Sequence, residues 1–473
     1  MNAIATFPAP PATAGPTPTP GRVAILGGGL TGLAAAWQLR RQGVAVTVFE
    51  AGSAPGGVIA SVRDGDWLVE AGPNTLFENS PALSGFIDAL GLGPRRLAAA
   101  PAAQRRYVVR GGVPVTVPDS PPKFVTTRLL SWRAKFQALG EPFRGRGPAD
   151  ADESIADFVV RRLGREFLDY IVNPFVAGVF AGDPAQLSVR HAFPKLQALE
   201  QKHGSLIRGS LARHKGAAAP RGSMISFPDG LAEVPRVLAA SLGSDLRLNH
   251  RVVTVRRIGS AWQVEYLSPQ GIAEETFAAV ICALPPRALL GVAFAGVPDA
   301  AALGQFALVT LPPVASVFLG YRREDVAHPL DGFGMLTPEV EGRRILGTLF
   351  SSTLFPGRAP AGHVALTTFV GGTRQPELAR LADRELVDTV QAELQALLGV
   401  RGAPVKVRIQ RWPQAITQYT VGYQRFKDAC ATAEAGAPGL FIGGTCRDGV
   451  SLSQCIVAGE RLATAARAHV GAV

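Results

Sequence analysis

The sequence predicts an α/β protein whose Rossmann-like dinucleotide-binding domain is assembled from discontinuous segments. Three observations support this fold class. A glycine fingerprint follows an apolar run near the amino terminus, at residues 23–57. Alternating apolar and polar residues predict strands in the middle of the chain, and a glycine pair followed by a helical pattern comes near the carboxyl terminus, at residues 440–468. Strand patterns that alternate with helical patterns are typical of a parallel sheet covered by helices.

The amino-terminal fingerprint combines a buried strand, a glycine turn and a helix. Residues 23–26 form the apolar strand, Gly27, Gly29 and Gly32 supply the G-x-G-x-x-G turn, and a helix is predicted over residues 33–42. The first glycine permits the tight turn, the second lets a pyrophosphate approach the backbone, and the third lets helix and strand pack closely. Free N–H groups at the start of the helix then bind the phosphates.

An acidic residue completes this pattern. Residues 44–49 predict a second strand, and Glu50 at its carboxyl end can accept hydrogen bonds from a ribose diol. A glycine turn used only for packing would leave the position of Glu50 unexplained, so we interpret the segment as a dinucleotide site. The residues predicted to form it are Gly27, Gly28, Gly29, Leu30, Thr31, Gly32, Glu50 and Ala51.

The dinucleotide is predicted to be FAD rather than NAD. Ala54-Pro55-Gly56-Gly57 places a glycine pair just after the acid, which a nicotinamide domain does not need. A flavoenzyme that uses NAD(P)H usually has two fingerprints, and no second one of equal quality follows in this chain. Electrons are therefore expected to reach the flavin directly from the substrate.

The composition is that of a globular protein with more than one domain. The chain has 473 residues, 47% hydrophobic and 18% charged, so we expect two or three domains. Residues 1–20 lack the basic start and apolar centre of a signal peptide and are predicted to be a disordered tail. The sequence shows no uninterrupted apolar run of the roughly 18 residues that a spanning helix needs, so none is expected.

The cysteines predict thiols rather than disulfides or a metal site. Cys282, Cys430, Cys446 and Cys455 show no C-x-x-C spacing. We expect them to be reduced in a cytoplasmic protein, with no metal bound. Cys446 lies near a predicted flavin turn, and we interpret it as an inert small residue.

The formal net charge of +11 predicts attraction to anions. No nucleic-acid-binding motif accompanies it, so nucleic acid is not an expected partner. A carboxylate-bearing substrate, an anionic membrane surface and a composition bias without a partner stay open as explanations.

Between about residues 98 and 213 the pattern changes to helices and loops. A helix near residues 129–139 is predicted to have one apolar face with a basic border. Such a stripe fits burial in the protein core or a position in a membrane interface, and both alternatives stay open on the residues alone. The apolar face consists of Leu129, Trp132, Phe136 and Leu139, and the border of Arg128, Arg133 and Lys135.

The rest of the chain alternates strands with helices. Two-residue periodicity predicts strands at residues 248–255, 262–267 and 276–283, and apolar runs predict strands at 314–321, 344–350 and 364–370. A long helix is predicted over residues 380–398. Residues 440–444 form a strand ending in glycines, and a helix from Val450 or Ser451 to about residue 468 would place its positive end beside the flavin.

Segments far from the fingerprint carry a family resemblance. They are NPFVAGVFAGDP (173–184), GFGML (332–336), LGTLFSS (346–352), TFVGG (368–372) and GVSL (449–452). From about residue 22 to 465 the chain resembles the amine-oxidase-like flavoprotein superfamily and, within it, the oxygen-dependent protoporphyrinogen oxidase family. Stricter amine oxidases often have arginine after the second glycine pair, whereas Val58 stands here, as hydrophobic residues do in porphyrinogen oxidases.

The resemblance implies three domains after the predicted tail. Residues 21–97, 220–290 and 405–473 would form the FAD-binding domain, and residues 291–404 a substrate-binding domain with a mixed sheet. Residues 98–219 would be an α-helical insertion that associates with membranes and contributes a substrate channel. This favours the membrane-interface alternative for the helix near residues 129–139.

The resemblance also implies roles for individual residues. Arg106 matches an arginine that holds a substrate propionate, and a guanidinium pairs with a carboxylate through two parallel hydrogen bonds. Gly178 matches a glycine whose backbone lies against the substrate, and Val253 a residue beside adenine. Apolar residues that sandwich the macrocycle match Leu336, Leu349 and Phe369. The further implied cofactor contacts are Gly56, Gly57, Val58, Gly72, Pro73, Asn74, Thr75, Trp412, Gly444, Val450, Ser451 and Leu452.

The activity that the resemblance implies is an FAD-dependent oxidation at CH–CH bonds, from protoporphyrinogen IX to protoporphyrin IX, in haem biosynthesis. Hydride would pass from a methylene bridge to flavin N5 in each of three rounds, and three molecules of dioxygen would leave as hydrogen peroxide. The implied partners are the porphyrinogen and dioxygen. Peripheral contact with the inner face of the cell membrane and a homodimer are further expectations.

Three alternatives stay open. Coproporphyrinogen III, with four propionates instead of two, is the main competing substrate. Another oxidase of the superfamily, acting on amines or carotenoid precursors, would share the fingerprint and the carboxyl-terminal glycine strand. A non-enzymatic escort protein on the same fold would not bind FAD, and the intact glycines with Glu50 argue against it.

Overall fold

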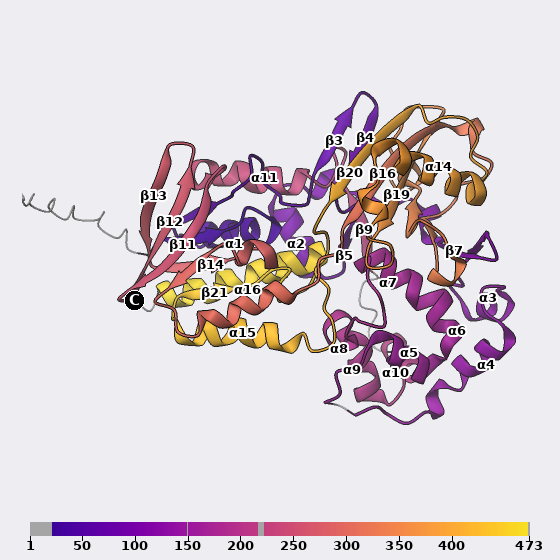
Figure 1. Cartoon of the computed structure of the whole chain (residues 1–473), viewed down its shortest axis with the longest axis horizontal. Helices are drawn as coiled ribbons and strands as arrows, with labels where there is room; N and C mark the ends of the chain where they lie inside the picture. Colours follow the sequence, from indigo (N-terminus) through magenta and orange to yellow (C-terminus); the bar gives the residue numbers. More distant parts are fainter. Residues whose placement is uncertain (1–20, 149, 216–221, 472–473) are drawn as a thin grey trace, which may run out of the picture.

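The computed structural model describes residues 21–148, 150–215 and 222–471. The predicted tail at residues 1–20 lies outside the described residues. Within the described ranges the chain forms two large sheets and a group of short helices (Figure 1). A five-stranded sheet with its helices makes one half of the molecule, and a seven-stranded sheet with the short helices makes the other.

The five-stranded sheet is parallel throughout, in the order β10-β2-β1-β14-β21. Both of its faces are covered, so its strands are continuous apolar runs such as VAIL and AVIC. They come from three separated parts of the chain, which confirms the predicted α/β class with a Rossmann-like domain built from discontinuous segments. They are β1 (Val23–Leu26), β2 (Val46–Phe49), β10 (Leu246–Arg247), β14 (Ala279–Cys282) and β21 (Leu440–Ile442).

Two layers of helices enclose this sheet because alternate residues of a strand point to opposite faces. On β1, Val23 and Ile25 pack in one core, and Ala24 and Leu26 pack in another. The predicted helix over residues 33–42 begins three residues earlier than expected, at Leu30, because the fingerprint glycine before it serves as the extended N-cap. The helices of the first layer are α1 (Leu30–Arg41), α2 (Pro81–Ala89), α11 (Glu233–Leu242) and α16 (Leu452–Val470), and α15 (Gln424–Gly436) lies in the second.

A four-stranded sheet adjoins this domain, in the order β13-β12-β11-β15. The prediction of a single strand over residues 276–283 is wrong, because the chain changes sheets inside it. Ala278 lies between the two strands and donates its N–H to the carbonyl oxygen of Arg22, 2.8 Å away. The four strands are β11 (Arg251–Ile258), β12 (Ala261–Ser268), β13 (Gly271–Phe277) and β15 (Ala293–Ala295).

The seven-stranded sheet is mixed, in the order β20-β16-β19-β18-β17-β7-β8, with β7 and β17 parallel and the other neighbours antiparallel. One face packs on α14 (Asp383–Leu398), close to the helix predicted over residues 380–398. Its strands are β7 (Tyr107–Arg110), β8 (Val113–Thr116), β16 (Val314–Arg322), β17 (Gly334–Leu336), β18 (Gly347–Leu349), β19 (His363–Gly371) and β20 (Lys406–Trp412).

This sheet takes strands from all three predicted domains. The segment predicted as purely helical contributes β7 and β8, because the N–H of Phe333 donates to the carbonyl oxygen of Arg105 and sets β7 beside β17. The segment assigned to the FAD-binding domain contributes β20. The domain boundaries therefore stay a proposal.

Smaller elements join the two halves. β3 (Ser61–Asp64) and β4 (Trp67–Glu70) form a hairpin, and β5, β6 and β9 form a three-stranded sheet. The remaining bounds are β5 (Leu76–Glu78), β6 (Leu97–Ala98), β9 (Ser223–Ser226), α12 (Pro286–Leu289) and α13 (Ser351–Leu354).

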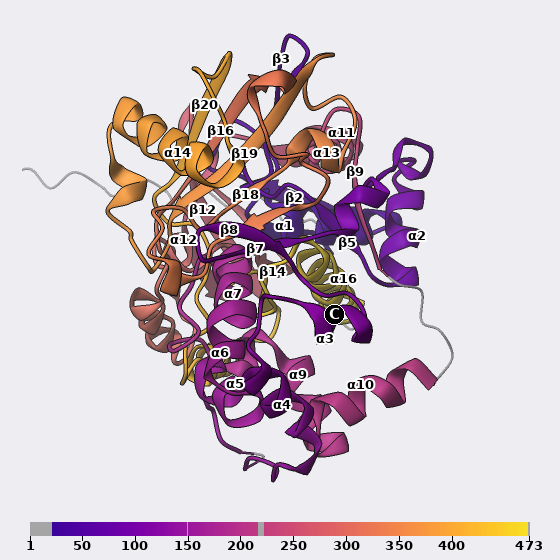
Figure 2. The same cartoon turned by 90° about the vertical axis from the view of Figure 1, so that its right-hand side faces the viewer.

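The group of short helices lies below the seven-stranded sheet, with α7 next to the strands (Figure 2). None of the described helices is long and apolar enough to cross a membrane. The members of the group are α3 (Pro121–Thr126), α4 (Trp132–Leu139), α5 (Ile155–Leu163), α6 (Arg165–Phe167), α7 (Asn173–Phe180), α8 (Val189–Ala192), α9 (Pro194–His203) and α10 (Leu206–Lys215).

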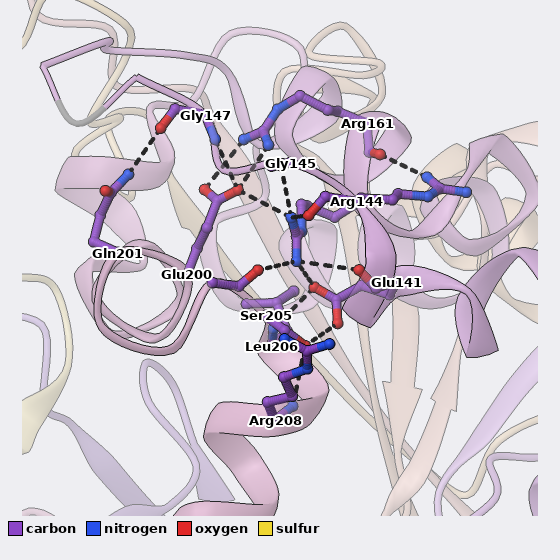
Figure 3. A network of polar contacts seen from close by, with 12 residues as sticks. Glu141, Arg144, Gly145, Gly147, Arg161, Glu200, Gln201, Ser205, Leu206 and Arg208 are labelled. Atoms are coloured by element: carbon purple, nitrogen blue, oxygen red, sulfur yellow. Dashed lines mark hydrogen bonds and ion pairs between the residues drawn. The ribbon is translucent and has the colours of Figure 1, made fainter.

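A buried polar network holds these helices together (Figure 3). Arg162 of α5 and Glu141 are both inaccessible to solvent and form an ion pair. Glu141 also accepts from the N–H groups of Leu206 and Ile207 at the start of α10, at 2.9 and 3.2 Å. Glu200 of α9 adds an ion pair with Arg161, at 2.7 Å. These ion pairs and hydrogen bonds join α5, α9 and α10 to the turn at Glu141. No local sequence pattern predicts them.

The apolar stripe near residues 129–139 is not part of the core. Leu129 is buried, but it precedes α4, and the stripe on the helix is exposed: 62% at Trp132, 68% at Phe136 and 56% at Leu139. The alternative of a core-facing helix is therefore wrong. The border also differs from expectation, since Lys135 is buried and donates to the carbonyl oxygens of Val125 and Thr127.

Candidate functional site

The glycine fingerprint forms a tight turn with one open side. Gly27 has a φ of +103°, a conformation that favours glycine. A Cβ on Gly32 would overlap the carbonyl oxygen of Gly27, so α1 can approach β1 this closely only with glycine there. Gly29, by contrast, has no atom within 4 Å of the place where its Cβ would be. The free space at the start of α1 is where a pyrophosphate would approach the helix N–H groups.

Glu50 is held in place by the turn that it faces. One carboxylate oxygen accepts from the N–H of Gly28 and the other from the N–H of Gly52, both at 2.7 Å. A carboxylate has about four acceptor positions, so two stay available for a ribose diol. The predicted adenine contact, Val253, lies where the pairing of β11 with β12 shifts register, and such a bulge re-aims a side chain.

Predicted cofactor contacts from distant segments lie together next to this turn. Gly56 forms a parallel bridge with Gly29 and donates its N–H to the carbonyl oxygen of Gly28, 2.8 Å away. A Cβ on Gly72 would overlap the carbonyl oxygen of Val58. Trp412 reaches the same segment, because its Nε1 donates to the carbonyl oxygen of Ala71 at 2.9 Å.

The carboxyl-terminal glycine turn meets the amino-terminal one. Gly444 has a φ of +97°, and the place of its Cβ lies 3.5 Å from Oγ1 of Thr31. Ser451 caps α16 through a capping box with Gln454. The helix therefore begins within two residues of the predicted start at Val450 or Ser451. Leu452 begins α16, so the amino termini of α1 and α16 lie on the same side of the site.

Sequence reasoning missed the residues that support this turn. A carboxylate oxygen of Asp448 accepts from the N–H of Gly444 at 2.7 Å, and Arg461 pairs with the same carboxylate. Tyr419 and Tyr423 donate their hydroxyls to the carbonyl oxygens of residues 445 and 446, each at 2.9 Å. An acid four residues after a glycine pair is a usable signal, whereas nothing local marks the two tyrosines.

The cysteine of this turn is a buried thiol. All four cysteines are buried and form no disulfide, and a hydrogen bond with Cys430 together with burial raises the pKa of the Cys446 thiol well above its ordinary value. A protonated buried thiol is a poor nucleophile, which supports the interpretation of Cys446 as an inert residue. Among the described residues no group of three or more His, Cys, Asp or Glu side chains could hold a metal ion.

The residues predicted to contact substrate lie on one side of the seven-stranded sheet and on the facing α7. A Cβ on Gly178 would lie 2.8 Å from Cδ2 of Leu336, so a larger residue there would displace the end of that side chain. Phe369 packs against Ala177 of α7, and Leu349 packs in a cluster with Phe333. The structure therefore brings Gly178, Leu336, Leu349 and Phe369 onto adjacent elements, and their role in binding stays a prediction.

Two consecutive arginines at the edge of this surface differ in their partners. Arg105 forms an ion pair with Asp331. Arg106 is exposed, and its guanidinium lies 5.6 Å from the centre of the Phe333 ring with no acidic partner among the described residues. An unpaired guanidinium beside an apolar surface suits the carboxylate of a large apolar ligand, which favours Arg106 over Arg105 for that role.

The described residues fit FAD. The site has open space at Gly29, a fixed carboxylate at Glu50 and two helix amino termini at one edge. A dinucleotide needs these features for its pyrophosphate and its ribose. The fold and this site define a flavin-dependent oxidoreductase.

The chain belongs to the family of flavin containing amine oxidoreductases, which it matches over residues 30–467. The protein therefore binds FAD. It is 36% identical to protoporphyrinogen oxidase 2, chloroplastic/mitochondrial, of Arabidopsis thaliana over 93% of both chains. It is 28% identical to coproporphyrinogen III oxidase of Staphylococcus aureus over 93% of this chain and 97% of that protein.

Solved structures confirm the fold. A crystal structure from Exiguobacterium sp., of a protein provisionally called a protoporphyrinogen oxidase, superposes with a TM-score of 0.81. The two sequences are 24% identical, and the match covers 96% of this chain and all of the other. Cyclohexylamine oxidase from Brevibacterium oxydans, 18% identical, has a TM-score of 0.68 over 96% of this chain and all of that one. Likeness at these identities concerns the fold alone.

Proposed function

We propose that the protein is an FAD-dependent porphyrinogen oxidase that converts protoporphyrinogen IX to protoporphyrin IX in haem biosynthesis. The observation that carries this proposal is the 36% identity over 93% of both chains with a plant protoporphyrinogen oxidase. The surface between Arg106 and Gly178 supports it, because it combines apolar side chains with one unpaired cation.

The chain's own part in this reaction is to bind and orient the macrocycle. FAD, when bound, supplies the acceptor for the electrons of each oxidation and passes them to dioxygen. Leu336, Leu349 and Phe369 would contact the faces of the macrocycle and exclude water, and Arg106 would fix one propionate. Orientation of this kind lowers the barrier because the reacting atoms are already placed.

Coproporphyrinogen III is the competing substrate, since it carries four propionates and relatives named for its oxidation are 28% identical or less. Arg105 is neutralised by Asp331, which leaves the charge of Arg106 uncompensated at this edge. One such cation suits a substrate with two propionates on one side better than a substrate with four.

A single assay tests the proposal. The FAD-loaded protein is mixed in air with protoporphyrinogen IX or with coproporphyrinogen III, and porphyrin fluorescence is followed. We expect a rapid rise with protoporphyrinogen and a slower one with coproporphyrinogen. The reverse order would assign the protein to coproporphyrinogen, and no rise with either substrate from a yellow, FAD-loaded protein would contradict the proposal.

We further propose peripheral contact with the cytoplasmic face of a membrane. Trp132, Phe136 and Leu139 form an exposed stripe on α4, and Phe143, which follows it, is 87% exposed. Arg128 and Arg133 are exposed beside this stripe. Aromatic side chains with a basic border favour the headgroup region of an anionic bilayer, where an apolar porphyrinogen would also concentrate. The expected homodimer stays a prediction.

A further inference from the structure

A small enclosed cavity lies between the predicted flavin site and the predicted substrate surface. Its volume is about 10 Å³, which is room for one water molecule. Asn74, a predicted cofactor contact, forms part of its wall, and Thr367 of β19 forms another part. Glu70 of β4 and Arg358, which follows α13, complete its polar lining. No role in the proposed reaction has been given to this cavity.

Arg358 lines this cavity and carries an unsatisfied donor. The residue is 2% exposed, and its Nη2 donates to Oγ of Ser226 at 2.5 Å and lies 3.4 Å from a carboxylate oxygen of Glu70. Its Nη1 is buried without a hydrogen-bond partner among the described residues. Buried N–H groups of charged side chains are nearly always paired with protein or with ordered water, and a polar cavity of this size supplies the place for that water.

Two hydroxyl groups lead from the cavity towards the substrate surface. Ser351 and Thr367 both line the cavity, and their hydroxyl oxygens lie 2.8 Å apart. Thr367 is two residues before Phe369 in β19 and pairs with Leu349 of β18, so these side chains share one face of the sheet. Hydroxyls both donate and accept, so they can pass a proton from this face into the cavity.

On the other side of the cavity, Glu70 leads towards solvent. Its carboxylate accepts from the hydroxyl of Ser61 at 2.5 Å and from the N–H of Leu231 at 2.9 Å. Glu70 is 4% exposed, whereas Ser61 on β3 is partly exposed. A path of polar groups therefore runs from the predicted substrate surface to solvent. It passes from the hydroxyl of Thr367 through the cavity to the carboxylate of Glu70 and then to the hydroxyl of Ser61.

We propose that one water molecule occupies this cavity, bound to Nη1 of Arg358, and that Glu70 takes up through it the protons that pyrrole nitrogens lose during oxidation. The inference rests on the proposed function. In each round the porphyrinogen loses one hydride, which carries two electrons to the cofactor. It also loses one proton from a pyrrole nitrogen. An N–H bond breaks, an O–H bond forms on Glu70, and the proton then leaves through Ser61. Arg358 is a positioning residue, and Glu70 acts through the water without touching substrate.

The charges around Glu70 suit this role. Burial raises the pKa of Glu70 above its ordinary value, and the hydroxyl of Ser61 and the positive charge of Arg358 offset part of that rise. Arg236 of α11 also faces Glu70, while Arg63 and Glu233 act on Arg358. A carboxyl group whose pKa is moved towards neutrality can both accept and release a proton at the working pH.

Four variants test the inference in the full-length, FAD-loaded protein. Glu70→Gln removes the proton acceptor and Arg358→Met removes the water ligand. Thr367→Val interrupts the hydroxyl pair. The matched control is Thr368→Val, because Thr368 is equally buried and pairs with the hydroxyl of Thr348 at 3.0 Å on the opposite face of the sheet.

We expect kcat for protoporphyrinogen to fall about 10-fold to 100-fold in Glu70→Gln and Thr367→Val, with KM unchanged. The wild-type fall of kcat at acid pH should vanish in Glu70→Gln and should move to higher pH in Arg358→Met, since a positive charge near the carboxyl is lost. Thr368→Val should keep the wild-type pH profile. A Glu70→Gln enzyme with wild-type kcat and pH profile, or with a raised KM alone, would overturn the inference.

Two readouts need no turnover. Infrared spectra of the FAD-loaded protein should show a carboxylic acid band that titrates above the ordinary pKa of a glutamate side chain and is absent in Glu70→Gln. A high-resolution crystal structure should show one water within hydrogen-bond distance of Nη1 of Arg358. If the wild type oxidises no porphyrinogen, the proposed function fails, while these readouts still decide the water site and the titration of Glu70. A dry cavity, or a Glu70 whose pKa is not raised above its ordinary value, contradicts the inference by itself.

Discussion

Two buried arginines, each beside a glutamate, differ in the hydrogen bonding of their terminal nitrogens. Arg162 in the helical group is inaccessible to solvent, and both of its terminal nitrogens donate: to the carboxylate of Glu141 and to the carbonyl oxygens of residues 144, 145 and 204. Only its Nε lacks a partner among the described residues. Arg358 in the other half is almost as buried and lines a cavity, yet its Nη1 has no hydrogen-bond partner among the described residues.

The terminal nitrogens of the two arginines therefore differ in how completely they are paired. Burying a charge is costly unless it is paired and hydrogen-bonded, so the full use of both terminal nitrogens of Arg162 indicates a residue that holds elements together. An incompletely satisfied charge indicates that a group other than the described side chains completes the site. Proteins retain such incomplete sites where function requires them, and the position of Arg358 between predicted cofactor and substrate contacts fits that rule.

The largest expected effect concerns Arg162. Arg162→Met leaves Glu141 buried without its cationic partner, while Glu200 keeps its ion pair with Arg161, and we expect the free energy of unfolding to fall by about 3–5 kcal/mol. Arg165→Met is the matched control, because Arg165 is an exposed arginine in the adjoining helix, and its ion pair with Asp169 should contribute about 0.5 kcal/mol or less. Urea unfolding followed by circular dichroism measures both. Equal free energies of unfolding in the two variants would show that the buried pair of Arg162 contributes no more to stability than the exposed pair of Arg165.

Arg106 extends the comparison to an exposed arginine. Arg106→Ala should leave the stability unchanged but raise KM for protoporphyrinogen about 10-fold or more, because a charge-assisted hydrogen bond to a carboxylate contributes about 1.5–3 kcal/mol. We expect kcat to change little, since a propionate contact is equally strong in ground and transition states. Arg105→Ala, whose side chain is paired with Asp331, is the control and should affect KM less. A fall in kcat at constant KM would tell against the assigned role.

The pKa values of the two buried glutamates, Glu141 beside Arg162 and Glu70 beside Arg358, are shifted in opposite directions. Burial tends to raise the pKa of Glu141, but hydrogen bonds from Ser205, Leu206 and Arg162 outweigh it, so the folded pKa lies below the ordinary 4.5. Its contribution to stability is therefore present above pH 4.5 and is lost as pH falls through the folded pKa. Burial raises the pKa of Glu70 above 4.5, so its ionisation opposes folding as pH rises from 4.5 through the folded pKa.

Unfolding free energies measured from pH 3 to pH 8 test these signs. Glu141→Gln should flatten the loss of stability below pH 4.5, and Glu70→Gln should flatten the loss above it. Each shift of one pKa unit corresponds to about 1.4 kcal/mol. If both variants changed the same side of pH 4.5, the two clusters would not differ as described.

The smallest expected effect concerns the exposed stripe of the helical group. Phe136→Ser should weaken binding to vesicles that contain anionic phospholipid by about 1 kcal/mol, or roughly fivefold, because only part of the ring would enter the interface. Ile272→Ser is the control, since Ile272 is 71% exposed on β13. Vesicle co-sedimentation provides the measurement. Equal binding of both variants and the wild type would remove α4 from the proposed membrane contact.

The sequence predicted what is local. The strand, turn and helix around Gly29 follow from the spacing of the glycines alone. Each glycine is needed for a tight turn or a close contact with atoms that are within about ten residues in the chain. The split at Ala278 was missed because an apolar run continues across it without a turn residue. A helical stripe such as that of α4 shows that one face is apolar, but it does not show whether protein or lipid covers that face.

The rest depends on contacts between distant segments. The hydrogen-bond partners of Arg162 lie 17 to 42 residues away in the chain, and Glu70 and Arg358 come from opposite halves of the chain. No periodicity or motif links such pairs, and a cavity exists only when the packing around it is known. The residues that the resemblance implies for substrate binding lie on adjacent elements, and their role stays a prediction, whereas the polar cavity became visible only in three dimensions.

In the proposed reaction, electrons pass from a porphyrinogen to the FAD of this protein, and anaerobic mixing tests this transfer. The FAD-loaded protein is combined with protoporphyrinogen IX without oxygen, and the yellow flavin absorbance is followed in a stopped-flow spectrometer. We expect the absorbance to be lost as porphyrin appears and to return when air is admitted. A flavin that stays oxidised in the presence of excess protoporphyrinogen and coproporphyrinogen would contradict it.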